Sequence, residues 1–271
     1  MTKQNNKEKN NMEIILEELG SRFKDYRKYT YQSEDEISIL KAAQLAKHKP
    51  LKESNRFRQN YNFTLMQNSK ESVENILERA ISYINNNQIK DSFYNQYPFD
   101  AGQHIDLLRR TKQDFEIIEL KQWDNDKDSP LYALIELLKY YFLLSKKEHL
   151  SFKKENQYLK QEQIREFTIL APLEYYKNFD FLNTFGELKK LSDNLTAYLN
   201  KKRNNHIKIS FKYFNLDRNI FENIKNSLVD KEGNSLKNKE KIKTDWTLKE
   251  NQEKLKEIES ALLWQNWKTI F

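Results

Sequence analysis

The feature that most constrains this chain is a pair of alternating segments joined by a short polar turn. Residues 102–111 and 114–121 each alternate between apolar and polar positions as a β-strand does, and residues 111–114 supply the turn. Successive side chains of a strand point to opposite faces, so Glu119 and Lys121 share one face. The pattern predicts a hairpin with a carboxylate and an ammonium pointing the same way at the end of an apolar strand.

A second acidic group belongs to the first strand of this hairpin. Asp106 lies there between Ile105 and Leu107. Burying charges without a partner or a metal is costly. We therefore predict that Asp106 and Glu119 jointly bind a divalent cation, with Lys121 beside it. The alternative from the residues alone is a structural ion pair on a strand.

These residues resemble the PD-(D/E)xK nuclease superfamily, which has the restriction-endonuclease-like fold. The resemblance rests on Gly102-x-x-x-Asp106-Leu-Leu, the short hairpin, and Glu119-Leu120-Lys121 closing an apolar strand. It implies that Asp106 and Glu119 bind Mg²⁺ or Mn²⁺, with the Leu120 carbonyl completing the protein ligands, because Mg²⁺ prefers oxygen donors. It also implies that Lys121 positions or activates the attacking water.

The chain departs from the family pattern at one position, because no proline precedes Asp106. The nearby Pro98-Phe99-Asp100 makes Asp100 the alternative first ligand. We prefer Asp106 because it lies within the alternating run. A second triplet, Glu187-Leu188-Lys189, lies in a helical pattern with no acidic strand before it, and we expect it to be a solvated helix face.

Helical and strand patterns alternate around the hairpin. The expected elements are a helix capped by Ser72, the hairpin, a helix with Ser129 as N-cap and Pro130 at its first position, a strand over 166–171, a helix over 181–199 and a strand over 206–214. The strand that would precede the hairpin has no clear pattern, and residues 94–99 are the candidate for it. This order predicts a mixed α/β fold with a central mixed sheet. It agrees with the αβββαβ core that the resemblance implies.

Three regions follow from this assignment. We expect a helical N-terminal extension over 1–68, the nuclease-like core over 69–215, and a helical C-terminal extension over 216–271 that packs on the core. Within the last region, residues 230–244 are predicted to be a charged loop. The tryptophans and the phenylalanine near the end of the sequence are expected to dock on the core.

Two helices carry further polar candidates. Glu74 and Glu78 lie one turn apart on the first helix of the core, where a solvated acidic face is the expected role and assistance to the metal is the alternative. Glu136 and Tyr140 lie on the helix after Lys121, and they are candidates to support the site or are simply helix-surface residues.

Charge and composition narrow the function classes. A net charge of +7 favours polyanionic partners such as nucleic acid, although lysine-rich coding bias can give the same balance. The absence of cysteine excludes disulfides, cysteine-ligated zinc and a thiol nucleophile. The longest apolar stretch, 131–144, is broken by Glu136 and Lys139 and is too short to cross a bilayer, which needs about 20 residues. We expect a cytoplasmic protein with no membrane partner.

The sequence therefore predicts a metal-dependent endo- or exonuclease that hydrolyses phosphodiester bonds in nucleic acid, with DNA as the expected substrate. Two other hypotheses for the function are also compatible with the sequence. One is a catalytically inactive module of the same fold that binds nucleic acid or a protein, and the other is a mostly helical interaction protein. The oligomeric state is open, and a homodimer is one option because many enzymes of the resembling family cut two strands as dimers.

Overall fold

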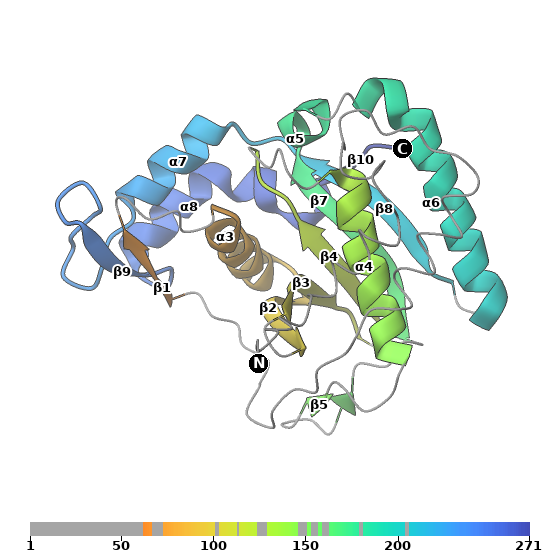
Figure 1. Cartoon of the computed structure of the whole chain (residues 1–271). Helices are drawn as coiled ribbons and strands as arrows, with labels where there is room; N and C mark the ends of the chain where they lie inside the picture. Colours follow the sequence, from red (N-terminus) through yellow and green to blue (C-terminus); the bar gives the residue numbers. More distant parts are fainter. Residues whose placement is uncertain are drawn as a thin grey trace, which may run out of the picture.

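A mixed sheet lies at the centre of the structure, a computed structural model that describes residues 62–66, 73–100, 103–112, 114–123, 129–145, 151–152, 157–158, 163–178, 181–203 and 206–271 (Figure 1). Within these residues the sheet has six strands in the order β10-β8-β7-β4-β3-β2. The strands are β2 (Ser92–Asp100), β3 (Gln103–Arg110), β4 (Phe115–Leu120), β7 (Ile164–Pro172), β8 (Lys208–Phe214) and β10 (Lys268–Thr269). Neighbouring strands β2, β3 and β4 are antiparallel, whereas β4, β7 and β8 run parallel.

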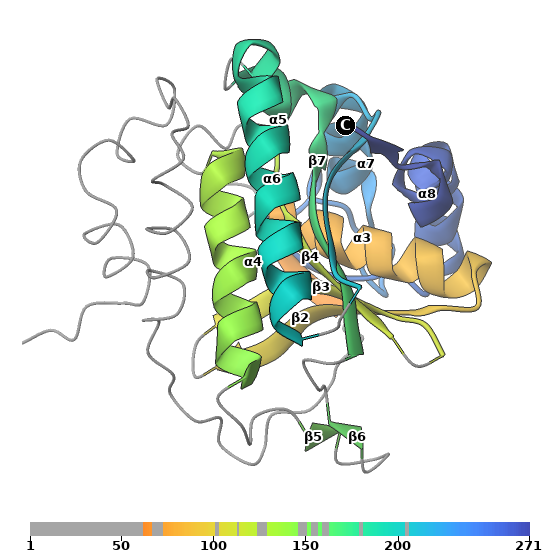
Figure 2. The same cartoon turned by 90° about the vertical axis from the view of Figure 1, so that its right-hand side faces the viewer.

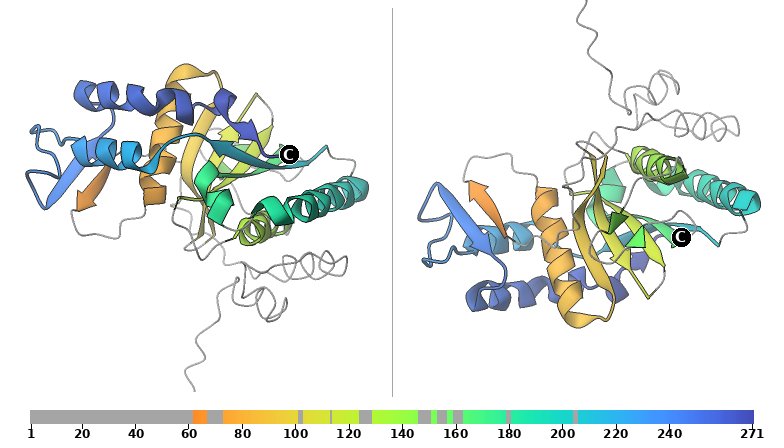
Figure 3. Two further views of the ribbon diagram at one scale, coloured as in Figure 1. Left: turned by 90° about the horizontal axis from the view of Figure 1, so that it is seen from above. Right: turned by 90° about the horizontal axis from the view of Figure 1, so that it is seen from below.

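Helices cover both faces of the sheet, as Figures 2 and 3 show. The described helices are α3 (Val73–Gln88), α4 (Pro130–Ser145), α5 (Leu173–Asn178), α6 (Phe181–Arg203), α7 (Arg218–Ser227), α8 (Lys249–Leu262) and the short 3₁₀ helix η4 (Trp264–Asn266). Side chains from α4, α5 and α6 form one apolar cluster with one face of the sheet. Those from α3, α7 and α8 form a second cluster with the other face. The protein is therefore a three-layer α/β/α structure.

Strand β4 shows how the sequence builds this arrangement. All six of its residues are buried, because a strand with helices on both sides has no solvent-facing surface. Ile117 belongs to the cluster under α4, and Ile118 belongs to the cluster under α3. The alternation also sends Glu116 and Glu119 to opposite faces, so that each joins a different group of charged residues.

Most of the predicted elements of the core are confirmed. The hairpin, the strands expected over 94–99, 166–171 and 206–214, and the helices after Ser72, after Ser129 and from Phe181 are all present within a residue or a few of the expected bounds. Ser129 caps α4, since its Oγ accepts a hydrogen bond from Tyr132 N at 3.2 Å. The coarse prediction of a mixed α/β fold with a central mixed sheet is confirmed as well.

The flanking regions differ from the expectation of purely helical extensions. The charged loop expected over 230–244 includes residues 241–244, but these belong to strand β9 (Lys241–Asp245). This strand pairs antiparallel with β1 (Asn62–Met66), which belongs to the region expected to be helical. The remainder of that region, residues 1–61, lies outside the described residues. Pairing between segments so far apart leaves no local sequence pattern, which explains the error.

The C-terminal residues dock on the sheet as predicted. Trp267 is buried in the cluster that contains α3 and α8, and β10 adds an edge strand beside β8. Phe271 packs on Phe211, with ring centroids 5.1 Å apart. None of the described helices combines the length and apolar character that crossing a membrane requires. A further short pair, β5 (Ser151–Phe152) with β6 (Gln157–Tyr158), lies outside the central sheet.

Glu116 anchors a buried network of charges on the α8 side of the sheet. Its carboxylate accepts hydrogen bonds from Arg109 Nη1 at 2.8 Å, Lys212 Nζ at 2.9 Å and Thr168 Oγ1 at 2.6 Å. The Trp264 indole N–H also donates to it at 3.1 Å, and the Arg109 guanidinium lies 3.5 Å from the centroid of that ring. Although burial raises the pKa of Glu116, the Lys212 ammonium and the other donors lower it below its usual value. This network joins β3, β4, β7, β8 and η4.

Replacing Glu116 by glutamine is expected to lower the free energy of unfolding by about 3 kcal/mol, because two buried cations lose their shared anion. Urea unfolding followed by circular dichroism measures the difference. Asp193→Asn serves as the control, since Asp193 pairs with Lys189 on the exposed face of α6 and such pairs contribute about 0.5 kcal/mol or less. Equal losses for the two variants would contradict the role given to Glu116.

Candidate metal centre

The antiparallel pairing between β3 and β4 stops at Asp106. Leu107 opposite Ile118 is the last backbone pair in this direction. Two residues further along β4, the Leu120 N–H donates to Asp106 Oδ2 at 2.8 Å. The acceptor from β3 is here a side-chain oxygen and not a backbone carbonyl. The N–H and C=O of one strand residue point to the same side, which places the Leu120 carbonyl on the edge of β4 that faces Asp106.

The backbone is also irregular on the other side of Asp106. Asn95 pairs with Leu107 and Tyr97 pairs with Ile105, so Gln96 is the residue opposite Asp106. Gln96 has a φ of 47°, which lies in the left-handed region. This conformation costs a non-glycine residue on the order of 1 kcal/mol. Asp106 thus lies at a point where the sheet is irregular toward both of its neighbouring strands.

Glu119 and Lys121 point toward α4 from the end of β4. Lys121 Nζ lies 2.8 Å from Glu119 Oε1 and 3.1 Å from Glu136 Oε2. Both Glu119 and Lys121 are about 4% exposed. The predicted shared face of these two residues is therefore what the structure has, and Glu136 of α4 is the second anion that holds the ammonium.

Helix α3 brings two more carboxylates to Asp106 from the opposite face of the sheet. Glu74, Glu78 and Asp106 each offer a carboxylate oxygen, and these oxygens all lie within 4.8 Å of one another. Glu78 is only 2% exposed. Figure 1 shows α3 and α4 on the two sides of β3 and β4. Asp106 is consequently the residue at which acidic groups from both faces meet.

Two buried carboxylate oxygens of this centre have no hydrogen-bond partner. They are Glu78 Oε2 on the α3 side and Glu119 Oε2 on the α4 side. A buried acceptor without a donor forfeits its hydration, and the cost is highest for a charged group. The donor set of clustered oxygens therefore fits a hard divalent cation such as Mg²⁺ or Mn²⁺, which binds carboxylates and retains waters.

The clustering of acids raises the pKa of three carboxyl groups. Burial and the charges of Asp106 and Glu74 raise the pKa of Glu78 well above its usual value. Burial, Asp106 and Glu136 do the same for Glu119. Burial, with a contribution from Glu136, raises the pKa of Asp106 to about 6, although Lys121 and the Leu120 N–H oppose the change. In each of these groups the neutral, protonated form is therefore favoured more than in an isolated carboxyl group.

Basic groups balance part of this charge. Burial lowers the pKa of Lys121, but the carboxylates of Glu119, Glu136 and Asp106 outweigh it and raise the pKa well above its usual value. Glu136 has a lowered pKa because the ammonium groups of Lys121 and Lys139 overcome the effect of burial. The acids that interact here outnumber the bases: they are Glu74, Glu78, Asp106, Glu119 and Glu136, against Arg79, Lys121 and Lys139.

Tyr140 closes the α4 side of the centre. Its hydroxyl donates to the His104 backbone carbonyl at 2.9 Å, which ties α4 to β3 next to Asp106. Burial, followed by the charge of Glu119, raises the pKa of Tyr140 well above its usual value, so the hydroxyl stays protonated. Glu136 and Tyr140 were candidates either to support the site or to be helix-surface residues. In the structure both contact the residues around the acidic centre.

The predicted site residues lie together, with one difference in grouping. Asp106, Glu119, Lys121 and Leu120 all lie at this end of β4, but Asp106 shares the compact group of oxygens with Glu74 and Glu78 and not with Glu119. Asp100 ends β2 opposite Gln103, and its side chain lies outside the described residues.

The expectation of a solvated acidic face on α3 is wrong for Glu78, which is buried. The sequence holds a pattern that points to this. Glu78, Ser82 and Asn85 follow one another at helical spacing beside the apolar positions, and all three are buried. These polar residues lie next to the apolar side of α3 and not opposite to it, which indicates that they are buried.

The Glu187-Leu188-Lys189 triplet lies in α6, as the helical pattern predicts. Lys189 is exposed and pairs with Asp193 one turn away. The same triplet spacing therefore gives a solvent-facing lysine on a helix and a buried lysine at the end of β4.

Comparison with protein-family models, with curated proteins and with solved structures finds no match for this chain.

The raised pKa of Asp106 predicts a pH dependence of stability when no divalent cation is present. The pKa rises from 3.8 in the unfolded chain to about 6 in the folded protein. The carboxyl group therefore contributes stability that is complete below pH 4 and is lost as the pH rises through about 6.

We expect the contribution of Asp106 to this loss to be about 1–3 kcal/mol, so that the loss is smaller in Asp106→Asn, whose amide oxygen can still accept the Leu120 N–H. Urea unfolding of both proteins in EDTA, at several pH values from 4 to 7, measures the difference. Parallel curves for the two proteins over this range would contradict it.

Proposed function

We propose that this protein is a metal-dependent nuclease of the PD-(D/E)xK type, with DNA as its substrate. The observation that carries the proposal is that Asp106 interacts by charge both with Glu78 of α3 and with Glu119 of β4, that Lys121 pairs with Glu119, and that one buried oxygen of Glu78 and one of Glu119 have no donor. Such a group of acids with raised pKa values and a paired lysine is typical of functional sites.

The order of elements supports the proposal. Helix α3, strands β2, β3 and β4, helix α4 and strand β7 follow one another along the chain, which is the αβββαβ order of the suspected core. The acidic centre lies where β3 and β4 cease to pair. A shared order of helices and strands is weak support for function by itself, so the chemistry of the site carries the proposal.

Two ligand sets share Asp106. On the α4 side, Asp106 would bind the cation with Glu119 and the Leu120 carbonyl, and on the α3 side it would do so with Glu74 and Glu78. A bound Mg²⁺ or Mn²⁺ would supply Lewis acidity and lower the pKa of a coordinated water. Asp106 would be needed by either set, so it is the least dispensable of the acids.

Lys121 is the basic side chain that pairs with Glu119 in this centre. Its ammonium would hold the attacking water or offset the negative charge that develops on the scissile phosphate. Glu136 is a positioning residue for Lys121, because it holds the ammonium from α4 at 3.1 Å. The net charge of +7 favours a polyanionic substrate.

One observation favours a second candidate function. Lys121 already has two carboxylate partners, Glu119 and Glu136, so this half of the centre is compensated without a cation. A module of the same fold that binds nucleic acid without cleaving it would suit such an arrangement. It would bind DNA with or without metal, and Lys121→Ala would leave this binding unchanged.

A cleavage assay separates the two functions. Wild-type protein is incubated with plasmid, linear duplex and single-stranded DNA in Mg²⁺, in Mn²⁺ and in EDTA. We expect cleavage only with the metals, and a loss of about 100-fold or more in Glu119→Gln and in Lys121→Ala, because a metal ligand and a group that stabilises the transition state are removed.

Lys189→Ala is the matched control for Lys121→Ala, since Lys189 belongs to the same kind of triplet but is exposed on α6. It is expected to cleave as the wild type does. Circular dichroism establishes that each variant is folded. Cleavage that persists in Glu119→Gln, or that is absent from the wild type with every substrate and metal, rules out this nuclease site.

Metal binding gives a readout that does not depend on activity. Isothermal titration with Mn²⁺ is expected to show binding by the wild type, and no binding by Asp106→Asn. Glu78→Gln should weaken the affinity by roughly tenfold or more if the α3 side holds the ion, because an oxygen donor of that set loses its charge. An unchanged affinity for Glu78→Gln would assign the ion to the Glu119 side.

A further inference from the structure

A basic ribbon projects from the C-terminal part of the protein, beyond α3. It consists of residues 229–245, in which Val229 pairs with Ser235 and Asp230 pairs with Thr244, and of β1, which pairs with β9 (Figure 1). Between the Asp230 loop and β9 lies a hollow of about 360 Å³. The loop turns at Gly233, whose φ of 79° lies in the left-handed region that glycine adopts readily.

The acids of this basic ribbon are used to hold its own backbone. Asp230 accepts hydrogen bonds from the backbone N–H groups of Glu232 at 3.0 Å and Asn234 at 2.8 Å, and it also pairs with Lys239. Asp245 accepts from the backbone N–H and the hydroxyl of Thr247 at 2.8 and 2.6 Å. These two carboxylates are directed at the turns that they stabilise.

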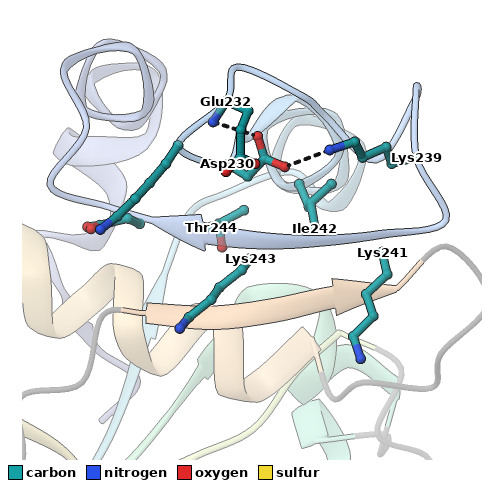
Figure 4. A pocket seen from close by; sticks show the side chains of 9 residues that line it. Asp230, Glu232, Lys239, Lys241, Ile242, Lys243 and Thr244 are labelled. Atoms are coloured by element: carbon teal, nitrogen blue, oxygen red, sulfur yellow. Dashed lines mark hydrogen bonds and ion pairs between the residues drawn. The ribbon is translucent and has the colours of Figure 1, made fainter.

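The lysines are directed to solvent. Ile242 lies on the side of β9 that faces Asp230, while Lys241 and Lys243 extend to the other side (Figure 4). Both are exposed, and neither has an ion pair with another residue in the described part of the chain. The exposed charged groups of residues 229–245 are five lysines against two acids: Lys231, Lys237, Lys239, Lys241 and Lys243, against Glu232 and Glu240.

A buried asparagine of α8 fixes the ribbon to the body of the protein. Asn251 is fully buried, accepts from the Val229 N–H at 2.9 Å, and donates to the carbonyls of Val229 at 3.0 Å and Asp245 at 2.8 Å. Lys254 adds an ion pair to Glu250 within α8 and contacts the end of α7. The strand that carries Lys241 and Lys243 is therefore held to the body of the protein by α8, whereas Lys239 also pairs with Asp230 within the ribbon.

The ribbon shares an apolar cluster with the helix that carries the α3 acids. Leu65 of β1 and Ile242 of β9 belong to the same apolar cluster as Ile76 and Leu77 of α3. Glu74 and Glu78 come from this helix. A long polyanion whose phosphate occupied the acidic centre would extend along α3 toward the exposed lysines.

We propose that the basic ribbon binds the sugar–phosphate backbone of a DNA duplex. Exposed lysines on a rigid strand, with the neighbouring acids turned inward, are complementary to the regular negative charge of a duplex. Lysines on edge strands also hinder unwanted strand pairing. β9 pairs with β1 on one side and meets Asp230 at an isolated bridge on the other, so Lys241 and Lys243 also protect the remaining edge of this two-stranded sheet, a role compatible with phosphate binding. The location relative to the acidic centre rests on the nuclease function proposed above.

Salt-dependent binding tests the ribbon separately from the centre. Fluorescence anisotropy with a 30-base-pair duplex is measured in EDTA, where no cleavage occurs, between 50 and 300 mM salt. The Lys241→Gln/Lys243→Gln variant is expected to bind roughly tenfold more weakly at about 0.1 M salt, and its slope of log affinity against log salt should fall by about 2, since each lost phosphate contact removes about 0.9. The control is Lys190→Gln/Lys201→Gln, which removes two exposed lysines of α6 on the other face of the sheet.

The outcomes separate the ribbon from the nuclease site. A loss of slope confined to the ribbon variant supports the proposal, whether or not the wild type cleaves DNA in metal. Ribbon and control variants with equal slopes overturn it, even if the wild type is an active nuclease. A wild type with no affinity for the duplex at 50 mM salt overturns the proposal as well. Circular dichroism of each variant tests whether unfolding causes a loss of affinity; both substituted side chains are exposed.

Discussion

The central constraint on this protein is the placement of negative charge at the point where two paired strands separate. Asp106 replaces a backbone carbonyl as the acceptor for the Leu120 N–H, and the side chains of α3 and α4 reach it from both faces of the sheet. A regular ladder at this position would have kept the two faces apart. The irregular backbone at Gln96 and the end of the pairing at Leu107 are thus the conditions that let acids from two layers meet.

The two ends of β4 show how differently buried charge can be arranged. Glu116 has two cations and two neutral donors within hydrogen-bond distance, and its pKa is lowered. Glu119 has one cation, Lys121, and two nearby acids, Asp106 and Glu136, and its pKa is raised. The first arrangement is complete and holds elements together. The second leaves oxygens without donors, which is the chemical difference between a structural network and a site with room for a ligand.

The sequence alone predicted the parts of the protein that depend on local patterns. Alternation placed the hairpin and the common direction of Glu119 and Lys121, and capping residues placed the start of α4. It did not predict burial of Glu78, because the charge of a helical glutamate favours solvent unless a packed neighbour is known. Nor did it predict β1 and β9, since each has only five residues and the alternation within so short a segment is no clear signal by itself. Tertiary pairing supplies what that segment lacks.

The pairing of β1 with β9 also has a kinetic consequence. The two strands are separated by roughly 175 residues of sequence, so their pairing closes one of the longest loops in the described chain. Closing a long loop lowers the entropy of the chain before the contacts between its ends contribute any stability. Such contacts therefore form late in folding. The segments that join last are commonly among those that open first in the native state. Backbone amides of β9 should therefore exchange with solvent deuterium well before those of β4, which is buried at the middle of the sheet.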